Sequence, residues 1–208
     1  MDFTSTGSLE ANLEAALRRL GSYFVNESPL HAAAHEIARR LDELGVAYAI
    51  AGALSLAAHG LVRATEDVDV LLSREGLERF KAAWIGRGYV DLRPGGKAIR
   101  DTQHGVKIDF LIQGEFPGDG APKPVSFPDP REAATTAGRL RVLSLPRLVE
   151  LKLASGMTAP HRLQDLADVQ RLVAVRKLPR EFAESLDPYV RPKFDELWST
   201  VQREPDDY

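Results

Sequence analysis

The chain has 208 residues, of which 44% are hydrophobic and 27% are charged, and its formal net charge is −3. This length can bury a hydrophobic core, and the small net charge excludes a strong overall attraction to nucleic acid or an acidic membrane. Because the chain has no cysteine, disulfides, zinc–thiolate sites and cysteine nucleophiles are excluded as well. The first ten residues show no signal segment, and no apolar stretch approaches the ~18 residues of a membrane helix. We therefore expect a cytoplasmic protein with no membrane partner.

Two amphipathic helices are predicted at the start of the chain. Residues 9–20 place their leucines on one stripe at helical spacing. The second helix has Ser28 as its cap, Pro29 at its first position and Gly45 at its exit, and its apolar residues recur at spacings of four and three. We expect both helices to pack on the core as a first unit, residues 1–45.

An α/β core is predicted for residues 46–130, because short apolar strand patterns alternate with helical ones there. The expected elements are a strand at 46–51, a short helix at 53–59, a strand at 67–72, a helix at 74–87, a hairpin at 89–101 and a strand at 106–112. Residues 113–130 contain five prolines and three glycines, which indicates a loop and a domain boundary.

The third unit, residues 131–208, is predicted to be mainly helical after one strand at 140–143. A helix is expected from about Ser144 to a point before Gly156, and further helices are expected at 161–175 and after Pro179 and Pro188. The predicted fold class is α/β (α+β), with a small mixed twisted sheet, flanking helices and a helical C-terminal region. The cleft between the sheet and these helices is the expected active site.

A glycine turn predicts a phosphate-binding position in the core. Gly52 ends the first predicted strand, where it permits a tight turn and leaves room for a ligand. The first N–H groups of the following short helix would face a phosphate at this point. Ser55 offers a hydroxyl from the same helix.

Three carboxylates are predicted to meet beside this turn. Strand residues alternate between faces, so Asp67 and Asp69 emerge from the same face. Two such charges 4 Å apart repel by about 4 kcal/mol at an effective dielectric of 20, which a bound cation or a proton would relieve. Asp109 lies in an apolar strand, where an acid without a partner is costly. Because Mg²⁺ (or Mn²⁺) prefers carboxylate and phosphate oxygens, these three acids are the predicted metal ligands of a phosphoryl-transfer centre.

Each feature also has a simpler interpretation. An Asp-x-Asp pair is common on exposed strand edges, and a single glycine can be merely a turn. Asp109 can pair with Lys107 or with an arginine from a helix. His59 can simply pack or cap its short helix. The order of the features favours the phosphoryl-transfer interpretation, because a strand, a glycine turn, a helix, an acidic strand and a further buried acid follow one another.

Residues 49–72, with the sequence AIAGALSLAAHGLVRATEDVDVLL, resemble the nucleotidyltransferase superfamily related to DNA polymerase β. The signature of that superfamily is a Gly-Gly or Gly-Ser turn followed by an Asp-x-Asp/Glu pair. The run from His59-Gly60 through Arg63, Thr65, Asp67 and Asp69 is most similar to the AbiEii-like branch of abortive-infection toxins and related bacterial proteins.

This resemblance implies metal binding by Asp67 and Asp69, with Asp109 as the third carboxylate. It also implies that Gly52 and Ser55 lie near the triphosphate. Ala53 and Arg63 complete the predicted nucleotide-binding residues of this segment, and the alternatives for Arg63 are that it neutralises the carboxylates or is an ordinary surface arginine. Many relatives have Gly or Ser where this chain has Ala53, so a hydroxyl contact to phosphate is either missing or displaced to Ser55.

A second signature of the same branch lies in the predicted helical part, as a lysine in a leucine-rich helix followed by a basic-Asp-x-x-Asp stretch. Here these positions are Lys152, Asp165 and Asp168. The predicted division of roles gives Lys152 the triphosphate and Asp165 the acceptor, as a general base or a positioning group. The alternatives are that Lys152 extends its ammonium to solvent or forms a salt bridge with Asp165 that joins two helices.

The predicted function is therefore magnesium-dependent transfer of a nucleoside monophosphate from a nucleoside triphosphate to an acceptor hydroxyl. The acceptor stays open between transfer RNA, another protein and a small molecule. The resemblance adds a role as the toxin of a toxin–antitoxin pair, with a cognate antitoxin as partner. The main alternative is a catalytically inactive nucleotide-binding or protein-interaction module of the same fold, which Ala53 favours. A phosphodiesterase or nuclease is a weaker alternative, because no second His/Asp metal cluster accompanies the acids.

Overall fold

The computed structural model describes residues 9–15 and 29–203. Residues 9–15 are helical, and the rest of the helix predicted over 9–20 lies outside the described residues. Ser28, the predicted cap of the second helix, also lies outside them. The described strands are β1 (Tyr48–Ile50), β2 (Asp67–Leu72), β3 (Tyr89–Asp91), β4 (Ala98–Asp101), β5 (Lys107–Ile112), β6 (Ala134–Ala137) and β7 (Leu140–Leu143). The described helices are α2 (Pro29–Glu43), α3 (Gly52–Ala58), α4 (Arg74–Trp84), α5 (Pro130–Ala133), α6 (Leu145–Thr158), η1 (Pro160–Arg162), α7 (Leu163–Arg176), η2 (Arg180–Ser185) and α8 (Arg191–Arg203).

The strands form one mixed sheet in the order β3-β4-β5-β2-β1-β7-β6. Strand β2 runs parallel to β5 and antiparallel to β1, and β1 runs parallel to β7. This arrangement confirms the predicted α/β class and mixed sheet. Strands β6 and β7 follow the boundary predicted at residue 130, so the sheet is completed from that part of the chain and the C-terminal helices begin with α6.

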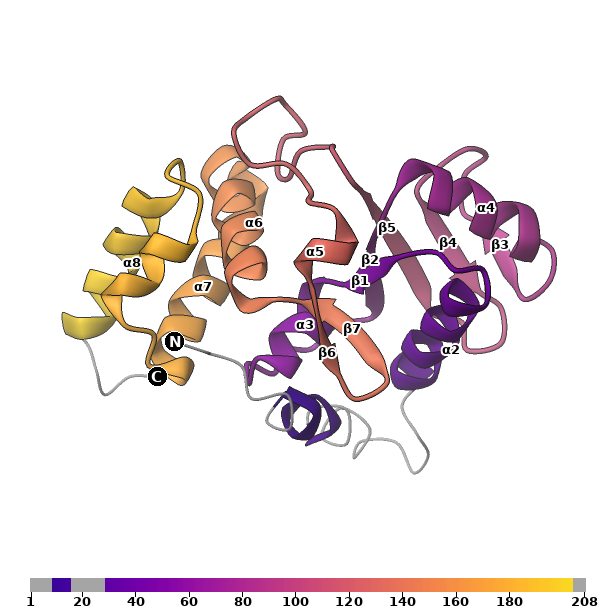
Figure 1. Cartoon of the computed structure of the whole chain (residues 1–208), viewed down its shortest axis with the longest axis horizontal. Coiled ribbons are helices and arrows are strands. Elements are labelled where there is room, and N and C mark those ends of the chain that lie inside the picture. Colours follow the sequence, from indigo (N-terminus) through magenta and orange to yellow (C-terminus); the bar gives the residue numbers. More distant parts are fainter. Residues whose placement is uncertain (1–8, 16–28, 204–208) are drawn as a thin grey trace.

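The two faces of the sheet are covered by different helices. Successive residues of β2 point to opposite faces, so their contacts show which helices cover each face. Val70 packs in a core with α2 and α4, whereas Leu71 packs in a second core with α6, α7 and α8. In Figure 1, α6, α7 and α8 lie on one side of the sheet, and α2 and α4 lie on the other. Asp67 and Asp69 alternate in step with Leu71, so the acids of β2 face the side of α6 and α7.

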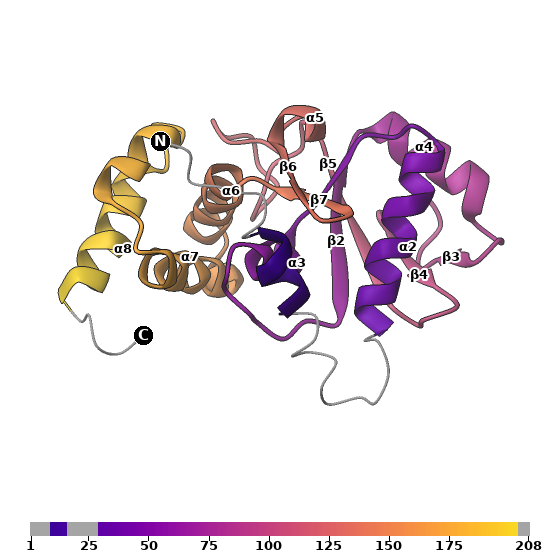
Figure 2. The ribbon, with the colours of Figure 1, turned by 60° about the horizontal axis from the view of Figure 1, so that its bottom comes forward.

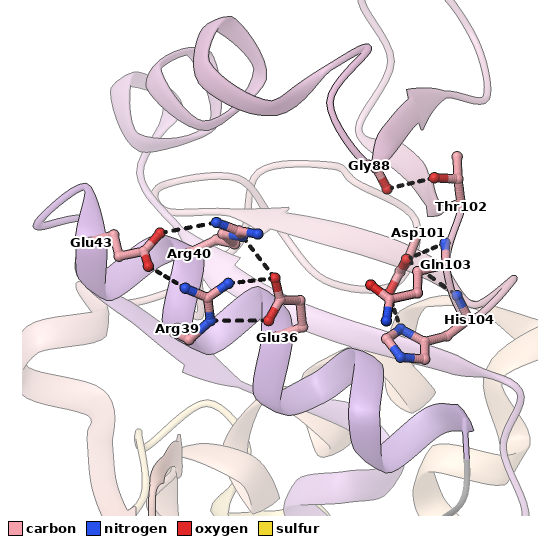
Figure 3. A network of polar contacts seen from close by, with 9 residues as sticks. All are labelled: Glu36, Arg39, Arg40, Glu43, Gly88, Asp101, Thr102, Gln103 and His104. Atoms are coloured by element: carbon pink, nitrogen blue, oxygen red, sulfur yellow. Dashed lines mark hydrogen bonds and ion pairs between the residues drawn. The ribbon is translucent and has the colours of Figure 1, made fainter.

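The polar residues of α2 and of the β4–β5 turn have local structural roles (Figure 3). The helix carries ion pairs at spacings of three and four among Glu36, Arg39, Arg40 and Glu43. In the turn, the buried Asp101 carboxylate accepts hydrogen bonds from the backbone N–H groups of the two residues at 103 and 104 and from the His104 ring. These contacts secure the helix surface and the turn, and they lie away from the acids of β2.

The prediction that α6 ends before Gly156 is wrong, because the helix continues to Thr158. A Cβ at Gly156 would lie 2.6 Å from Cγ of Leu166, so the missing side chain lets α6 and α7 pack closely. Strand β6 was not predicted, and its residues 134–137 form the edge of the sheet beside β7. Among the described residues, no helix combines the length and the apolar composition that crossing a membrane requires.

Candidate active site

Two adjacent strands bring the predicted acids together. In the parallel register of β2 and β5, Asp69 is the partner of Asp109, and Asp67 is the partner of Lys107. Since residues two apart on a strand share a face, these four side chains form a square on the face toward α6 and α7. The square therefore contains three carboxylates and one ammonium.

Gly52 and Asp69 are in direct contact, which explains the glycine in physical terms. Gly52 has a positive φ of 55°, and a Cβ at this position would lie 1.9 Å from Oδ2 of Asp69. Burial, followed by the neighbouring charges of Asp67 and Asp109, raises the pKa of Asp69 to about 6, against the opposing effects of Lys152 and Arg162. The carboxylate is therefore held against the turn in a setting that disfavours its negative charge.

The other two acids already have hydrogen-bond donors. Oδ1 of Asp67 accepts a hydrogen bond of 2.7 Å from the Thr65 hydroxyl, and Oδ2 of Asp109 accepts one of 2.5 Å from Nζ of Lys107. Among the described residues, no three His, Cys, Asp or Glu side chains are gathered closely enough to hold a metal ion. The predicted metal ligands thus share one face, but they do not form a ready three-ligand site.

The chemistry of this square nevertheless fits a divalent cation. Its donors are carboxylate oxygens, which Mg²⁺ prefers, and its three carboxylates lie on one face of two adjacent strands with a single ammonium. The pairing of Asp109 with Lys107, which the sequence left as an alternative, is confirmed. A cation that used Asp109 as a ligand would therefore compete with the ammonium of Lys107.

A cleft opens between the square and the C-terminal helices. Its residues come from the glycine turn, from the segment between α3 and β2, from strands β2, β5 and β7, from the loop between β5 and α5, and from α6, η1 and α7. They are Ala51, Gly52, Arg63, Asp69, Leu111, Pro117, Gly118, Phe127, Leu143, Leu148, Leu151, Lys152, Ser155, Arg162 and Asp165. Of the three predicted metal ligands, only Asp69 belongs to this lining, and three cations share the cleft with two carboxylates.

Lys152 lies at the centre of a buried polar cluster. Its Nζ donates to Oδ1 of Asp165 at 2.8 Å and to Oδ2 of Asp168 at 2.7 Å. The hydroxyl of Ser155 donates to the other oxygen of Asp165, and Nε of Arg63 lies 3.5 Å from Oδ1 of Asp168. The salt bridge from Lys152 to Asp165 that joins α6 and α7, one of the alternatives from the sequence, is thus confirmed. Lys152 lines the cleft while its ammonium is bound to the carboxylates of Asp165 and Asp168.

The remaining residues predicted for phosphate lie outside this cleft. Ala53 is buried, and Ser55 is fully buried with its hydroxyl donating to the carbonyl of Leu143 at 3.3 Å. Nε2 of His59 lies 2.7 Å from the same carbonyl, so its N–H donates there. Ser55 and His59 therefore attach α3 to the end of β7, and the position of Ser55 gives it no direct contact with a ligand in the cleft.

The buried ring of His59 predicts a loss of stability in mild acid. Burial lowers the pKa of His59 to about 4, so the unfolded state takes up its proton near pH 6.5 while the folded state stays neutral. Stability is then complete above pH 6.5 and falls as the pH drops toward 4, by about 2 kcal/mol between pH 7.5 and pH 5. Urea unfolding at these two pH values measures the loss. His59→Gln should remove this part of the pH dependence, and an equal dependence in both proteins would contradict the assignment.

Sequence reasoning missed two elements of the cleft. Arg162 lines it from η1 and acts on the charge of Asp69, but an arginine at the start of a helix gives no signal of this kind. The loop at 113–129 forms a wall because Gly118 presses against α6, where a Cβ would lie 2.8 Å from the carbonyl oxygen of Ser155. Nζ of Lys123 fixes this loop by donating to the carbonyl of Pro117 at 2.6 Å.

Comparison with known proteins adds evidence on the fold. No family model and no curated relative matches the chain. The solution structure of the antibiotic-resistance factor ANT(2'')-Ia aligns with a TM-score of 0.51 at 16% identity, over 82% of this chain and 93% of that one. The chain has a nucleotidyltransferase fold.

Two further solved structures align with lower TM-scores. JHP933 from Helicobacter pylori is 14% identical, with a TM-score of 0.45 over 87% of this chain and 94% of that one. The crystal structure of ANT(2'')-Ia in complex with adenylyl-2''-tobramycin is also 14% identical, with a TM-score of 0.45 over 82% of this chain and 95% of that one. A fold can host many functions, so the activity has to be argued from the site itself.

Proposed function

We propose that the chain is a magnesium-dependent nucleotidyltransferase that moves a nucleoside monophosphate from a nucleoside triphosphate to an acceptor hydroxyl. The observation that carries this proposal is the cleft in which Asp69, held against Gly52, faces the cations Lys152 and Arg162. The carboxylate of Asp69, with Asp67 and Asp109 beside it on the sheet, suits a divalent cation, and the cations on the other side of the cleft suit the oxygens of a triphosphate.

In this reaction the acceptor oxygen forms a bond to the α-phosphorus, and the bond from that phosphorus to the oxygen that bridges to the β-phosphate breaks. Pyrophosphate leaves with the electron pair of the broken bond. Mg²⁺ bound by Asp67, Asp69 and Asp109 would supply charge neutralisation and activation of the hydroxyl.

The other roles belong to side chains of the cleft. Arg162 has no carboxylate within ion-pair distance among the described residues, so we assign it to the phosphates. Arg63 and Lys152 are attached to buried acids and contribute positive potential to the same space. Asp165 lines the cleft opposite the square, so we assign it to the acceptor, whose hydroxyl proton it accepts.

The decisive experiment is transfer of label from each α-labelled nucleoside triphosphate, with Mg²⁺ and a total cell extract as the source of acceptor. Wild-type protein should label one fraction and release pyrophosphate. The double variant Asp67→Asn, Asp69→Asn should reduce transfer by at least about a hundredfold, because the carboxylates for the cation are gone. Asp195→Asn is the matched control, since this acid pairs with Arg180 far from the cleft. Undiminished transfer by the double variant would refute the proposal.

The ion pair of Lys107 with Asp109 favours a second candidate, a catalytically inactive nucleotide-binding or protein-interaction module. In such a module the ammonium would permanently replace the cation. The two candidates differ in turnover: a module binds a triphosphate without releasing pyrophosphate. Absence of pyrophosphate release with all four triphosphates would therefore select the module.

The acceptor class is the finer part of the proposal. RNA, protein and small-molecule acceptors separate in the labelling experiment by nuclease digestion, by protease digestion and by size. The AbiEii-like resemblance adds a toxin role with a cognate antitoxin in the cytoplasm. Growth arrest on expression of the wild type, and not of the double variant Asp67→Asn, Asp69→Asn, is the result that this role requires.

A further inference from the structure

We propose that Lys107 is a resident counter-ion of the acidic square, and that a divalent cation displaces its ammonium from Asp109 on binding. This inference rests on the proposed function, because that function assigns the divalent cation to the square. It concerns a lysine to which the sequence signatures give no role. In the absence of metal, the ammonium of Lys107 therefore occupies Asp109, and a metal ion has to compete with it for this ligand.

The register of the sheet places the lysine inside the square. Lys107 is the partner of Asp67 across the two strands, and it lies two residues before Asp109 on the same strand and face. Its Nζ donates to Oδ2 of Asp109 at 2.5 Å. The square thus has one built-in positive charge for its three negative charges.

The same geometry leaves the ammonium free to depart. The side chain of Lys107 is 42% exposed and that of Asp109 is 28% exposed, so the pair lies at the open edge of the site. A lysine has a long flexible stem, and an exposed ion pair is a weak interaction that water replaces at little cost. The inner carboxylate, Asp69, is instead fixed against Gly52. A divalent cation can therefore take the place of the lysine without moving the inner part of the site.

If a cation displaces the ammonium, both the stability of the metal-free protein and its affinity for metal depend on Lys107. In the absence of metal, the ammonium offsets the repulsion among the three acids, so removing it should destabilise the metal-free protein. In the presence of metal, the ammonium competes for Asp109, so removing it should strengthen metal binding. Opposite changes in stability and metal affinity are what distinguish a displaced counter-ion from a lysine that merely orients its neighbour.

The test compares wild-type protein with Lys107→Met, which keeps the stem and removes the charge. Lys97→Met is the matched control, because Lys97 is a similarly exposed lysine that pairs with Glu115 outside the square. Binding of Mn²⁺ is followed by electron paramagnetic resonance, and thermal unfolding is followed in EDTA and in excess Mn²⁺. No substrate is needed for either measurement.

Lys107→Met should bind Mn²⁺ about tenfold tighter than wild type, unfold at a lower temperature in EDTA and gain more from added Mn²⁺. Lys97→Met should match the wild type in all three. Equal or weaker Mn²⁺ binding by Lys107→Met would overturn the proposal, and so would an unchanged unfolding temperature in EDTA.

Failure of this inference is distinguishable from failure of the proposed function. The expected Mn²⁺ and stability changes without any nucleotide transfer by wild type would uphold the counter-ion and reject the enzyme. Transfer by wild type together with unchanged Mn²⁺ affinity in Lys107→Met would do the reverse. Absence of Mn²⁺ binding in both proteins would reject the displacement.

Discussion

Lys152→Met should lower the free energy of unfolding by about 3–5 kcal/mol, the usual cost of removing one partner from a buried ion pair. Lys152 is 7% exposed and Asp168 is fully buried, so the substitution leaves a carboxylate in the interior without its main counter-ion. Native domains are stable by only about 5–15 kcal/mol, so this loss is a large part of the total. Urea unfolding at neutral pH measures it directly.

A second variant separates the buried charge from the loss of packing. Adding Asp168→Asn to Lys152→Met removes the uncompensated negative charge, and the double variant should recover a substantial part of the lost stability. A Lys152→Met protein within 1 kcal/mol of wild type would contradict the structural role. If that protein also lost affinity for nucleoside triphosphates, the lysine would act on the triphosphate alone, as its sequence signature implies.

Gly52→Ala should reduce nucleotide transfer by at least about a hundredfold, because a misplaced reacting group can cost that much. The added methyl group meets Oδ2 of Asp69 and forces the carboxylate away from the turn. The positive φ at this position adds a backbone cost of about 1–3 kcal/mol. Transfer rates and urea unfolding measure the two effects separately.

Gly45→Ala is the control for the backbone cost alone. Gly45 has a φ of 61°, close to that of Gly52, but a Cβ at this position would have no heavy atom within 4 Å. Because of its positive φ, Gly45→Ala should lose about as much stability as the backbone strain alone costs Gly52→Ala, and it should keep the wild-type transfer rate. If both variants lost activity equally, the contact between Gly52 and Asp69 would not be the cause.

The sequence predicted those parts of the fold that depend on local pattern. Helix α2 and strand β2 were predicted closely, because a 3.6-residue or two-residue period is written in the segment itself. Strand β6 was missed, because the run Ala-Thr-Thr-Ala has no apolar alternation of its own and becomes a strand by pairing with β7. Gly156 was misread as a helix end, because only the packing of α7 explains a glycine inside α6.

The same division holds for the site. The positions of Asp67 and Asp69 on one face follow from the strand period, and their closeness to Asp109 follows once β2 and β5 are neighbours. The sequence named Lys107 as a partner of Asp109 but had no means of choosing it over a metal. Arg162 escaped notice, because it meets Asp69 only through the packing of η1 across the cleft. Interactions between distant segments are what a single sequence leaves undetermined.

The junction of β7 with α6 determines how the cleft can work. A single residue, Ser144, separates the last residue of β7 from the first residue of α6. The carbonyl of Leu143, at the end of β7, also accepts hydrogen bonds from Ser55 and His59 of the α3 segment. Helices α3 and α6 accordingly lie next to each other in Figure 2. The wall with Asp69 on β2 and the wall formed by α6, which follows β7, are thus attached to strands of the same sheet that are separated only by β1. A molecule in the cleft would therefore contact side chains attached to one sheet, and it would lie beside the loop at 113–129, which packs on α6 at Gly118.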